Sequence, residues 1–174
     1  MHEVKYLRLY LLRHAIAIKR GASGFLNDDR PLTREGIEKM KKAAKGIRRL
    51  CEDFELIITS PMQLACHTAK ILAWALKRKP KIIPSHDLLP GASPRKISAL
   101  IARYKKRDSL VLVGHEPDFS AFASYLLGAK KAAIELKKGG MCRIDIPFGK
   151  AMGRGILISL FPPKYLCMLA RGNC

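Results

Sequence analysis

Two histidines in this sequence directly follow runs of mainly apolar residues. His14 comes after Arg13 at the end of the run Leu-Arg-Leu-Tyr-Leu-Leu, and His115 comes after Gly114 at the end of Leu-Val-Leu-Val. Histidine can act as a nucleophile or proton carrier near neutral pH, and the planar guanidinium of arginine can bind two oxygens of an anion. A single histidine behind a strand is most often structural. Two in matching positions, one of them beside an arginine, indicate a site for chemistry on an anionic group.

Neither histidine has a second ligand at the spacing of a metal site. Structural zinc sites need such groups of Cys and His, and catalytic ones need three protein ligands around an open position. The sequence therefore favours a site that uses no metal and no other cofactor.

Alternating strands and helices are expected to position these residues. Short apolar runs predict the strands, apolar residues at helical spacing predict the helices, and Thr33, Ser60 and Ser93 are suited to cap helix N-termini. Strands are expected at 6–12, 55–59, 81–84, 109–113, 141–146 and 155–161, and helices at 33–50, 61–78, 94–105 and 117–127.

This order of elements predicts an α/β fold of three layers, with helices on both faces of a mostly parallel sheet and an antiparallel strand pair at the C-terminal end. Ligands of such sheets bind at the carboxyl ends of the strands. Arg13-His14, Ser60-Pro61 and Gly114-His115-Glu116 all lie at such ends. We therefore expect them to meet.

Four segments resemble those of the histidine phosphatase superfamily. They appear in the superfamily's order and span much of the chain: Leu11-Leu12-Arg13-His14-Ala15, Arg30-Pro31-Leu32-Thr33-Arg34-Glu35-Gly36, Thr59-Ser60-Pro61 with Thr68-Ala69, and Val113-Gly114-His115-Glu116-Pro117. The short length, the Leu89-Pro90-Gly91 loop and the Leu136-Lys137-Lys138-Gly139-Gly140 segment resemble the SixA-like phosphohistidine phosphatases more than the mutases.

The resemblance implies a phosphoglycerate mutase-like fold and a phosphatase of phosphoric monoesters or phosphoramidates. His14 would be the nucleophile that carries the phosphoryl group, while Arg13 and His115 would complete the catalytic set and bind phosphate. The leading substrate is phosphohistidine, on a protein or a small phosphoramidate. The alternatives are a phosphomonoesterase acting on a small metabolite and a weakly catalytic protein that binds phosphate or polyanions.

One position departs from the superfamily's pattern. Leu64 stands where related proteins place a second phosphate-binding arginine, four residues after the serine of Ser60-Pro61. If residue 64 faces the phosphate, the leucine supplies no donor there, and losing one such donor costs roughly 100- to 1000-fold in rate. Lys138 is the leading replacement and is added to the expected phosphate-binding residues, with an ordinary solvated lysine of a turn as the alternative. Arg30, Lys19 and Gln63 are weaker candidates.

The proton donor for the leaving group is not evident. The mutase-like branch has a glutamate after its third strand, but this chain reads His86-Asp87-Leu88-Leu89-Pro90-Gly91 there. Imidazole, with a pKa of about 6.5, is a better leaving group than an alkoxide, so a weak acid site suits phosphohistidine. Asp28, Asp29, Glu116 and Asp118 are the candidate proton carriers, and ordinary loop acids are the alternative for each.

The length predicts one compact domain. The resemblance implies that this domain, residues 1–174, is a histidine phosphatase domain. No apolar run is long enough to cross a membrane, the N-terminus is unlike a signal peptide, and the five cysteines show no zinc or disulfide pattern, so a cytoplasmic protein with reduced thiols is expected. The formal net charge of +19 attracts anions. The basic residues are scattered without a nucleic-acid-binding motif, which favours a phosphorylated, acidic substrate or simply solvated surfaces over nucleic acid.

Overall fold

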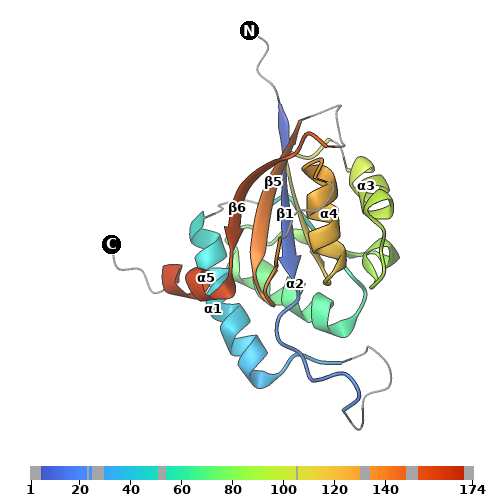
Figure 1. Cartoon of the computed structure of the whole chain (residues 1–174). Helices are drawn as coiled ribbons and strands as arrows, with labels where there is room; N and C mark the ends of the chain where they lie inside the picture. The colour runs from blue at the N-terminus through green and yellow to red at the C-terminus, as the bar shows by residue number, and fades with distance from the viewer. Residues whose placement is uncertain are drawn as a thin grey trace.

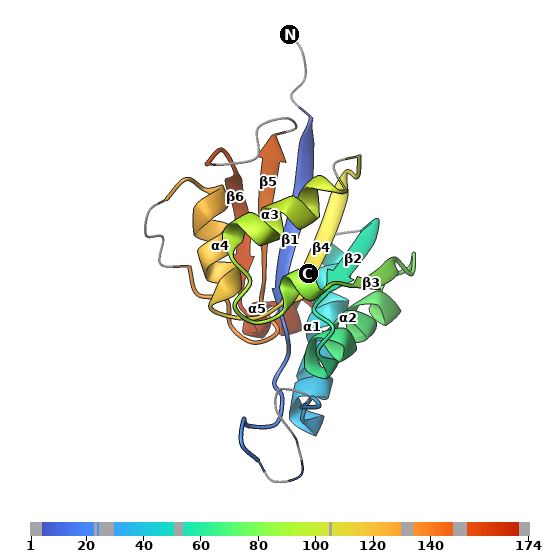
Figure 2. The same ribbon diagram turned by 90° about the vertical axis from the view of Figure 1, so that its right-hand side faces the viewer.

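The computed structural model describes residues 5–22, 24, 30–50, 54–104, 106–129, 134–147 and 153–170. Its elements are β1 (Tyr6–Arg13), α1 (Arg34–Leu50), β2 (Leu56–Thr59), α2 (Gln63–Ala75), β3 (Lys81–Pro84), η1 (His86–Leu88), α3 (Pro94–Ala102), β4 (Ser109–Gly114), α4 (Asp118–Leu126), β5 (Met141–Pro147), β6 (Ile156–Phe161) and α5 (Pro163–Leu169). Figures 1 and 2 show them in two views a quarter turn apart. Among the described residues, no helix has the length and apolar character needed to cross a membrane.

The six strands form one sheet in the order β3-β2-β4-β1-β5-β6. Strand β1 pairs in parallel with β4, which is followed by β2 and β3, also in parallel. Strand β5 runs antiparallel to both β1 and β6. The predicted three-layer α/β fold, with its antiparallel C-terminal pair, is confirmed.

Side chains alternate between two cores, as the twofold period of a strand requires. In β1, Tyr10 and Leu12 join one cluster, while Leu9 and Leu11 join the other. The first cluster is closed by α1, α2 and α5, and the second by α3 and α4, so helices cover both faces (Figure 2). Both faces of the central strands are buried, which explains their unbroken apolar sequences.

Two of the three predicted helix caps are present. The hydroxyl of Thr33 accepts a hydrogen bond from the amide of Gly36 at 3.0 Å, and that of Ser93 accepts from the amide of Lys96 at 3.3 Å. The prediction for Ser60 is wrong, because α2 begins at Gln63 with Met62 as its N-cap. This helix also ends at Ala75, before the expected residue 78, and helix α5 was not predicted.

Three of the five cysteines lie within the described residues, and all three are free thiols. Cys142 is fully buried, and this burial raises the pKa of its thiol to about 12. It behaves as a small apolar side chain, as expected. Cys51 and Cys174 lie outside the described residues.

Candidate active site

The ends of three neighbouring strands bring the predicted site residues together. Just beyond the strands, the amide of His14 donates to the carbonyl of Gly114 at 3.0 Å, and the amide of Ser60 donates to the carbonyl of Val113 at 2.9 Å. These bonds extend the parallel pairing by one step. They fix the backbone of both residues where the strand ends meet.

His14 is buried, with 8% of its surface exposed. Its Nδ1 lies 2.8 Å from the carbonyl oxygen of Ala15. A carbonyl can only accept, so Nδ1 carries the proton and Nε2 keeps its lone pair. Burial, together with the smaller effects of the positive charges of His115, Arg13 and Lys138, lowers the pKa of His14 to about 4, against the opposing effect of the Ala15 hydrogen bond. The ring is therefore neutral at pH 7.

His115 faces His14, with ring centroids 5.3 Å apart and ring planes inclined by 53°. Its Nε2 lies 2.8 Å from the hydroxyl oxygen of Ser60. Ser60 is fully buried, and its hydroxyl also accepts from the amide of Met62 at 3.4 Å. The hydroxyl expected to cap a helix thus orients the second histidine.

Arg13 and Lys138 complete the predicted set. One terminal nitrogen of Arg13 donates to the carbonyl of Leu136 at 2.7 Å. Its Nε is buried and has no hydrogen-bond partner among the described residues, so this donor is available to an anion. Lys138 follows two residues after Leu136, in the segment that this bond ties to the end of β1.

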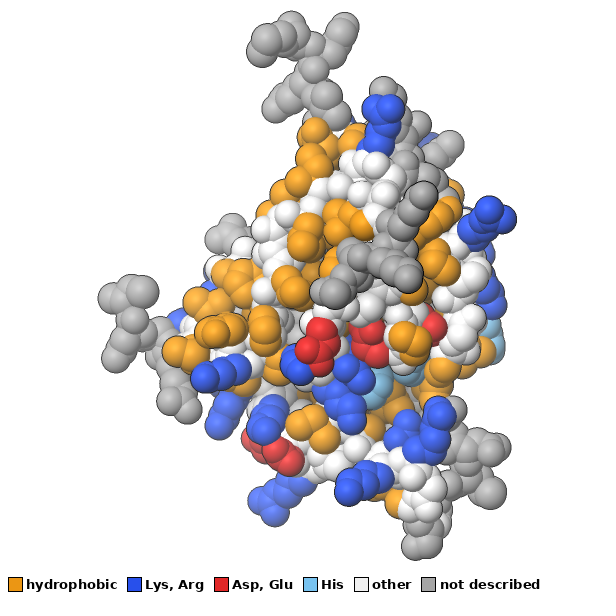
Figure 3. Space-filling model, viewed as in Figure 1, with side chains coloured by type: hydrophobic (Ala, Val, Ile, Leu, Met, Phe, Trp, Pro, Cys, Tyr) orange, Lys and Arg blue, Asp and Glu red, His pale blue; other side chains and the backbone are white. Residues whose placement is uncertain are grey.

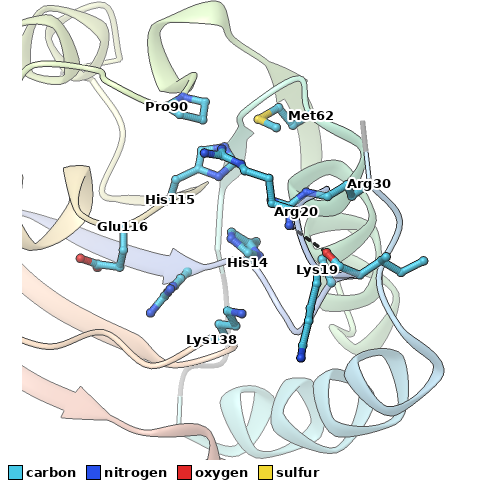
Figure 4. Close-up of a pocket in the computed structure, with 12 residues that line it drawn as sticks. His14, Lys19, Arg20, Arg30, Met62, Pro90, His115, Glu116 and Lys138 are labelled. Atoms are coloured by element: carbon cyan, nitrogen blue, oxygen red, sulfur yellow. Dashed lines mark hydrogen bonds between the residues drawn. The ribbon is translucent and has the colours of Figure 1, made fainter. Parts of the chain in front are cut away.

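All four predicted residues line one cavity of about 390 Å³ (Figure 4). Its lining consists of Arg13, His14, Ala17, Ile18, Lys19, Arg20, Arg30, Met62, Pro90, His115, Glu116 and Lys138. Figure 3 shows histidine surface beside a group of lysine and arginine side chains on the lower part of that view. The cavity thus offers an unprotonated imidazole nitrogen surrounded by cations, an arrangement suited to receiving a phosphoryl group.

A model of the histidine phosphatase superfamily (branch 1) matches residues 9–88, which include Arg13, His14 and Ser60. The chain belongs to the histidine phosphatase superfamily. An uncharacterized protein of Picosynechococcus sp. (strain ATCC 27264 / PCC 7002 / PR-6) is 34% identical over 174 residues, covering 92% of this chain and 99% of that protein.

Solved structures show the same fold. The protein histidine phosphatase SixA complexed with tungstate has a TM-score of 0.80 and 18% identity, covering 92% of this chain and 99% of its own. A proposed SixA phosphohistidine phosphatase from Agrobacterium tumefaciens has a TM-score of 0.76 and 23% identity, with 90% and 98% covered. Phosphoglycerate mutase from Bacillus anthracis str. Sterne has a TM-score of 0.76 and 14% identity, with 97% and 98% covered. The fold is phosphoglycerate mutase-like, as the sequence predicted.

The expectation that Leu64 faces the phosphate is wrong for this member of the superfamily. Leu64 has no exposed surface and packs in the core cluster that α1, α2 and α5 close. The residue from this segment that lines the cavity is Met62. Helix α2 begins later than predicted, so the register counted from Ser60 does not hold. Leu64 is a core residue.

Helix α2 contributes to the site through Thr68 instead. The Thr68 hydroxyl donates to the carbonyl of Leu64 at 2.7 Å and accepts from the amide of Ala15 at 3.0 Å. Ala15 is the residue whose carbonyl holds Nδ1 of His14. Thr68 therefore holds, through its amide, the residue whose carbonyl sets the tautomer of the His14 ring.

The structure gives the candidate proton carriers different surroundings. Glu116 lines the cavity, and burial, assisted by the nearby charge of Asp118, raises the pKa of its carboxyl. Asp118 instead accepts hydrogen bonds from the amides of Gly91 at 2.8 Å and Ala92 at 3.3 Å, which ties down the loop before α3. Asp28 and Asp29 lie outside the described residues.

Sequence reasoning missed one charged residue of the cavity. Arg20 lines it together with Lys19 and Arg30, the two weaker candidates for the absent arginine. Gln63, the other weak candidate, is exposed and is not part of the lining. Arg20 belongs to no motif, and its neighbour Lys19 in the loop after β1 was the only signal that could have suggested it.

Proposed function

We propose that this chain is a phosphatase that transfers a phosphoryl group from phosphohistidine to Nε2 of His14 and then to water. The observation that carries the proposal is the 2.8 Å contact between Nδ1 of His14 and the Ala15 carbonyl. It leaves Nε2 as the unprotonated nitrogen of a neutral ring that lines the cationic cavity. Membership of the histidine phosphatase superfamily and the SixA-like fold also support it.

The reaction has two steps. In the first, the Nε2 lone pair forms a bond to phosphorus, and the bond from phosphorus to the substrate imidazole breaks. The departing nitrogen takes the electron pair. In the second, a water oxygen bonds to phosphorus, the bond to Nε2 breaks, and the water proton leaves. Arg13, His115 and Lys138 are proposed to bind the phosphoryl oxygens, whose negative charge is the main quantity to be stabilised.

Glu116 is the proposed proton carrier for both steps. A carboxyl whose pKa is raised by burial keeps more of its proton near neutral pH and can donate it to a leaving group. In the second step the carboxylate can accept the proton of the attacking water. This acid also supports the second candidate function, hydrolysis of a small phosphate monoester, because an alkoxide needs a proton more than imidazole does.

The binding-protein alternative loses its main support. It depended on Leu64 weakening the phosphate site, but Leu64 is a core residue and further cations line the cavity. The proposed reaction draws its charge stabilisation from side chains. We therefore expect turnover of a phosphoramidate to continue in EDTA.

The proposal is tested by trapping the phosphoenzyme. Denaturing the protein during turnover of a labelled phosphoramidate should leave an acid-labile, alkali-stable label on the wild type and none on His14→Ala. A matched control is His67→Ala, which changes a histidine on α2 that does not line the cavity and should keep the label. Label persisting on a folded His14→Ala variant would show that another residue is the nucleophile.

A further inference from the structure

Exposed apolar side chains gather on the last strand and the last helix of the chain. Of the nine large apolar side chains that are exposed among the described residues, seven lie on β6 and α5. We call these seven the β6–α5 patch: Ile156, Leu157, Ile158, Leu160, Tyr165, Met168 and Leu169. Figure 3 shows apolar surface running along this side of the molecule. Exposed apolar groups that are concentrated in this way mark a surface that binds another molecule.

The backbone of β6 is also open to a partner. Within the part of the chain that the structure describes, β6 is an edge of the sheet and pairs with β5 on one side only. The opposite edge, β3, is four residues long and has Lys81 at one end and Pro84 at the other, which discourage a further strand. Strand β6 is six residues long and contains no charged residue and no proline. A bulge at Ile158 interrupts its register with β5, but residues 159–161 pair regularly. Of the two edges, β6 is therefore the one suited to accept another strand.

The patch begins close to the catalytic cavity. A Cβ added at Gly140 would lie 3.1 Å from the carbonyl oxygen of Phe161, the last residue of β6. Lys138 and Pro163, the first residue of α5, both line a small cavity of about 90 Å³. Lys138 also lines the catalytic cavity. The turn that carries Lys138 thus connects the catalytic cavity to the junction of β6 and α5.

The charge of the chain favours an acidic polypeptide as the occupant of this patch. From residue 146 to the C-terminus the sequence has four lysine or arginine residues and no aspartate or glutamate, and the whole chain has a formal net charge of +19. A second copy would bring the same positive charge, which opposes association, whereas an acidic partner is attracted. An anionic membrane would also be attracted. Lipid, however, cannot pair with the backbone groups of an edge strand, as an extended polypeptide does.

We propose that the β6–α5 patch docks the protein that carries the phosphohistidine, through an extended segment of alternating apolar and acidic residues that adds to the edge of β6. This inference rests on the proposed function and selects a protein, rather than a small phosphoramidate, as the substrate. Docking beside the catalytic cavity raises the effective concentration of the phosphohistidine at His14. It should therefore lower KM and leave kcat unchanged.

Three peptides, each chemically phosphorylated on a single histidine, test the docking surface. The short peptide has no docking segment, and the long peptide adds the run Val-Glu-Val-Glu-Val-Glu through a flexible glycine-serine linker. The third carries the same run with N-methylated valines, which keep their side chains but cannot donate backbone hydrogen bonds. We expect KM for the long peptide to be about tenfold or more below that for the short peptide, with equal kcat. The N-methylated peptide should behave like the short one.

A matched set of variants separates the patch from exposed apolar surface in general. Ile158→Ser on β6 and Tyr165→Ser on α5 should each raise KM for the long peptide by several-fold and leave the short peptide unaffected. Trp74→Ser removes an exposed aromatic side chain of α2, outside the patch, and should change neither value. Fluorescence anisotropy of the labelled, unphosphorylated run should show the same order of affinities without any turnover.

The outcomes distinguish the docking surface from the proposed function. Equal KM for all three peptides, or for the long and N-methylated ones, would overturn the docking surface and leave the proposed function standing. Binding of the unphosphorylated run that depends on Ile158 and Tyr165, without turnover of any of the peptides, would uphold the docking surface and overturn the proposed function.

Two further measurements test the other occupants. A wild-type dimer in sedimentation that Ile158→Ser dissociates would assign the edge of β6 to a second copy. Binding to phosphatidylserine vesicles that Tyr165→Ser abolishes would assign the patch to a membrane. Either result would overturn the docking of a protein substrate, for which we expect a monomer and no vesicle binding that depends on Tyr165.

Discussion

His14 and His115 carry the same ring but have different partners, and the partners separate their roles. A carbonyl holds Nδ1 of His14 and can only accept, so the tautomer is fixed with Nε2 unprotonated. A hydroxyl holds Nε2 of His115, and a hydroxyl can accept from a neutral or a charged ring. His14 is therefore restricted to the form that attacks phosphorus, while His115 can also act as a cation toward phosphate.

Replacing Glu116 tests the proton carrier. Glu116→Gln removes the proton without changing the shape of the side chain. Turnover of an alkyl phosphate should fall by roughly 100-fold or more, the usual contribution of general acid catalysis. Turnover of a phosphoramidate should fall much less, because its leaving group needs less protonation. Glu38→Gln, an exposed change on α1, is the control. Equal losses for both substrates would assign Glu116 a structural role.

Replacing Leu64 tests its place in the core. Leu64→Arg would bury a charge without a partner, and the free energy of unfolding should fall by roughly 3–5 kcal/mol. No gain in turnover is expected, since Leu64 does not line the cavity. Gln63→Arg places the same side chain on the exposed neighbouring position and should leave stability nearly unchanged. A stable Leu64→Arg protein with tenfold faster turnover would return this residue to the phosphate site.

Arg13, His14 and His115 could be found from the sequence because their backbone positions follow directly from strand ends. Lys19 and Arg20 could not be found in this way. Lys19 and Arg20 reach the cavity because the loop folds back and pairs with residues 31–33, and this pairing leaves no periodic pattern in the sequence. Strand positions follow a simple rule, whereas loop positions depend on contacts between distant residues.

At the level of elements, the two Ser-Pro dipeptides show where local signals fail. Ser93-Pro94 opens α3 as predicted, with the serine hydroxyl on the amide of Lys96. Ser60-Pro61 has the same local sequence, yet its serine hydroxyl contacts His115 and the helix starts later. A tertiary contact 55 residues away in sequence took the group that a helix N-terminus would otherwise use. Because the predicted helix began too early, the sequence analysis also predicted wrongly that Leu64 faces the phosphate.

Two glycines of α1 allow a test of whether the loop after β1 positions the substrate. A Cβ at Gly36 would lie 2.0 Å from the carbonyl oxygen of Ile16, and one at Gly46 would lie 1.9 Å from that of Leu166. Gly36→Ala and Gly46→Ala should both lower the free energy of unfolding, by roughly 1–3 kcal/mol. Only Gly36→Ala displaces the segment that contains Ala17 and Ile18, so only this variant should raise KM. The readouts are urea unfolding and steady-state kinetics.

The two glycines form a matched pair because a Cβ added at either position would come too close to a backbone carbonyl oxygen, by nearly the same amount. The Gly46 contact lies between α1 and α5, away from the cavity lining. If both variants raise KM equally, the effect reports general loosening of the molecule. If neither variant raises KM, the loop after β1 does not position the substrate.

For the molecule as a whole, the sequence predicted the layers because the sheet is buried on both faces and leaves unbroken apolar runs. The C-terminal helix α5 was missed because it is short, and its exposed side chains Tyr165 and Met168 obscure helical periodicity. The net charge of +19 was clear from the composition, but its value to function depends on which cations reach the cavity. Among the described residues, five lysine and arginine side chains line the cavity.

The buried, neutral His14 should make the stability of the whole molecule depend on pH. In the unfolded chain its pKa is the ordinary 6.5, and in the folded protein it is about 4. Between these values the unfolded chain binds a proton that the folded protein does not, so acid favours unfolding. The stabilisation is complete above pH 6.5 and is lost as pH falls toward 4, by roughly 3 kcal/mol in total.

Urea unfolding of wild type and His14→Asn at pH 7 and pH 4.5 isolates this contribution. Asparagine cannot titrate, and its amide can donate to the Ala15 carbonyl as Nδ1 does. The carboxyl groups titrate in both proteins, so the difference between them reports on position 14. We expect wild type to lose roughly 2–3 kcal/mol more than His14→Asn on acidification. His86→Asn changes an exposed histidine and should lose as much as wild type. If His14→Asn matches wild type at both pH values, His14 titrates normally in the folded protein, and the neutral nucleophile on which the proposed chemistry depends would have to be abandoned.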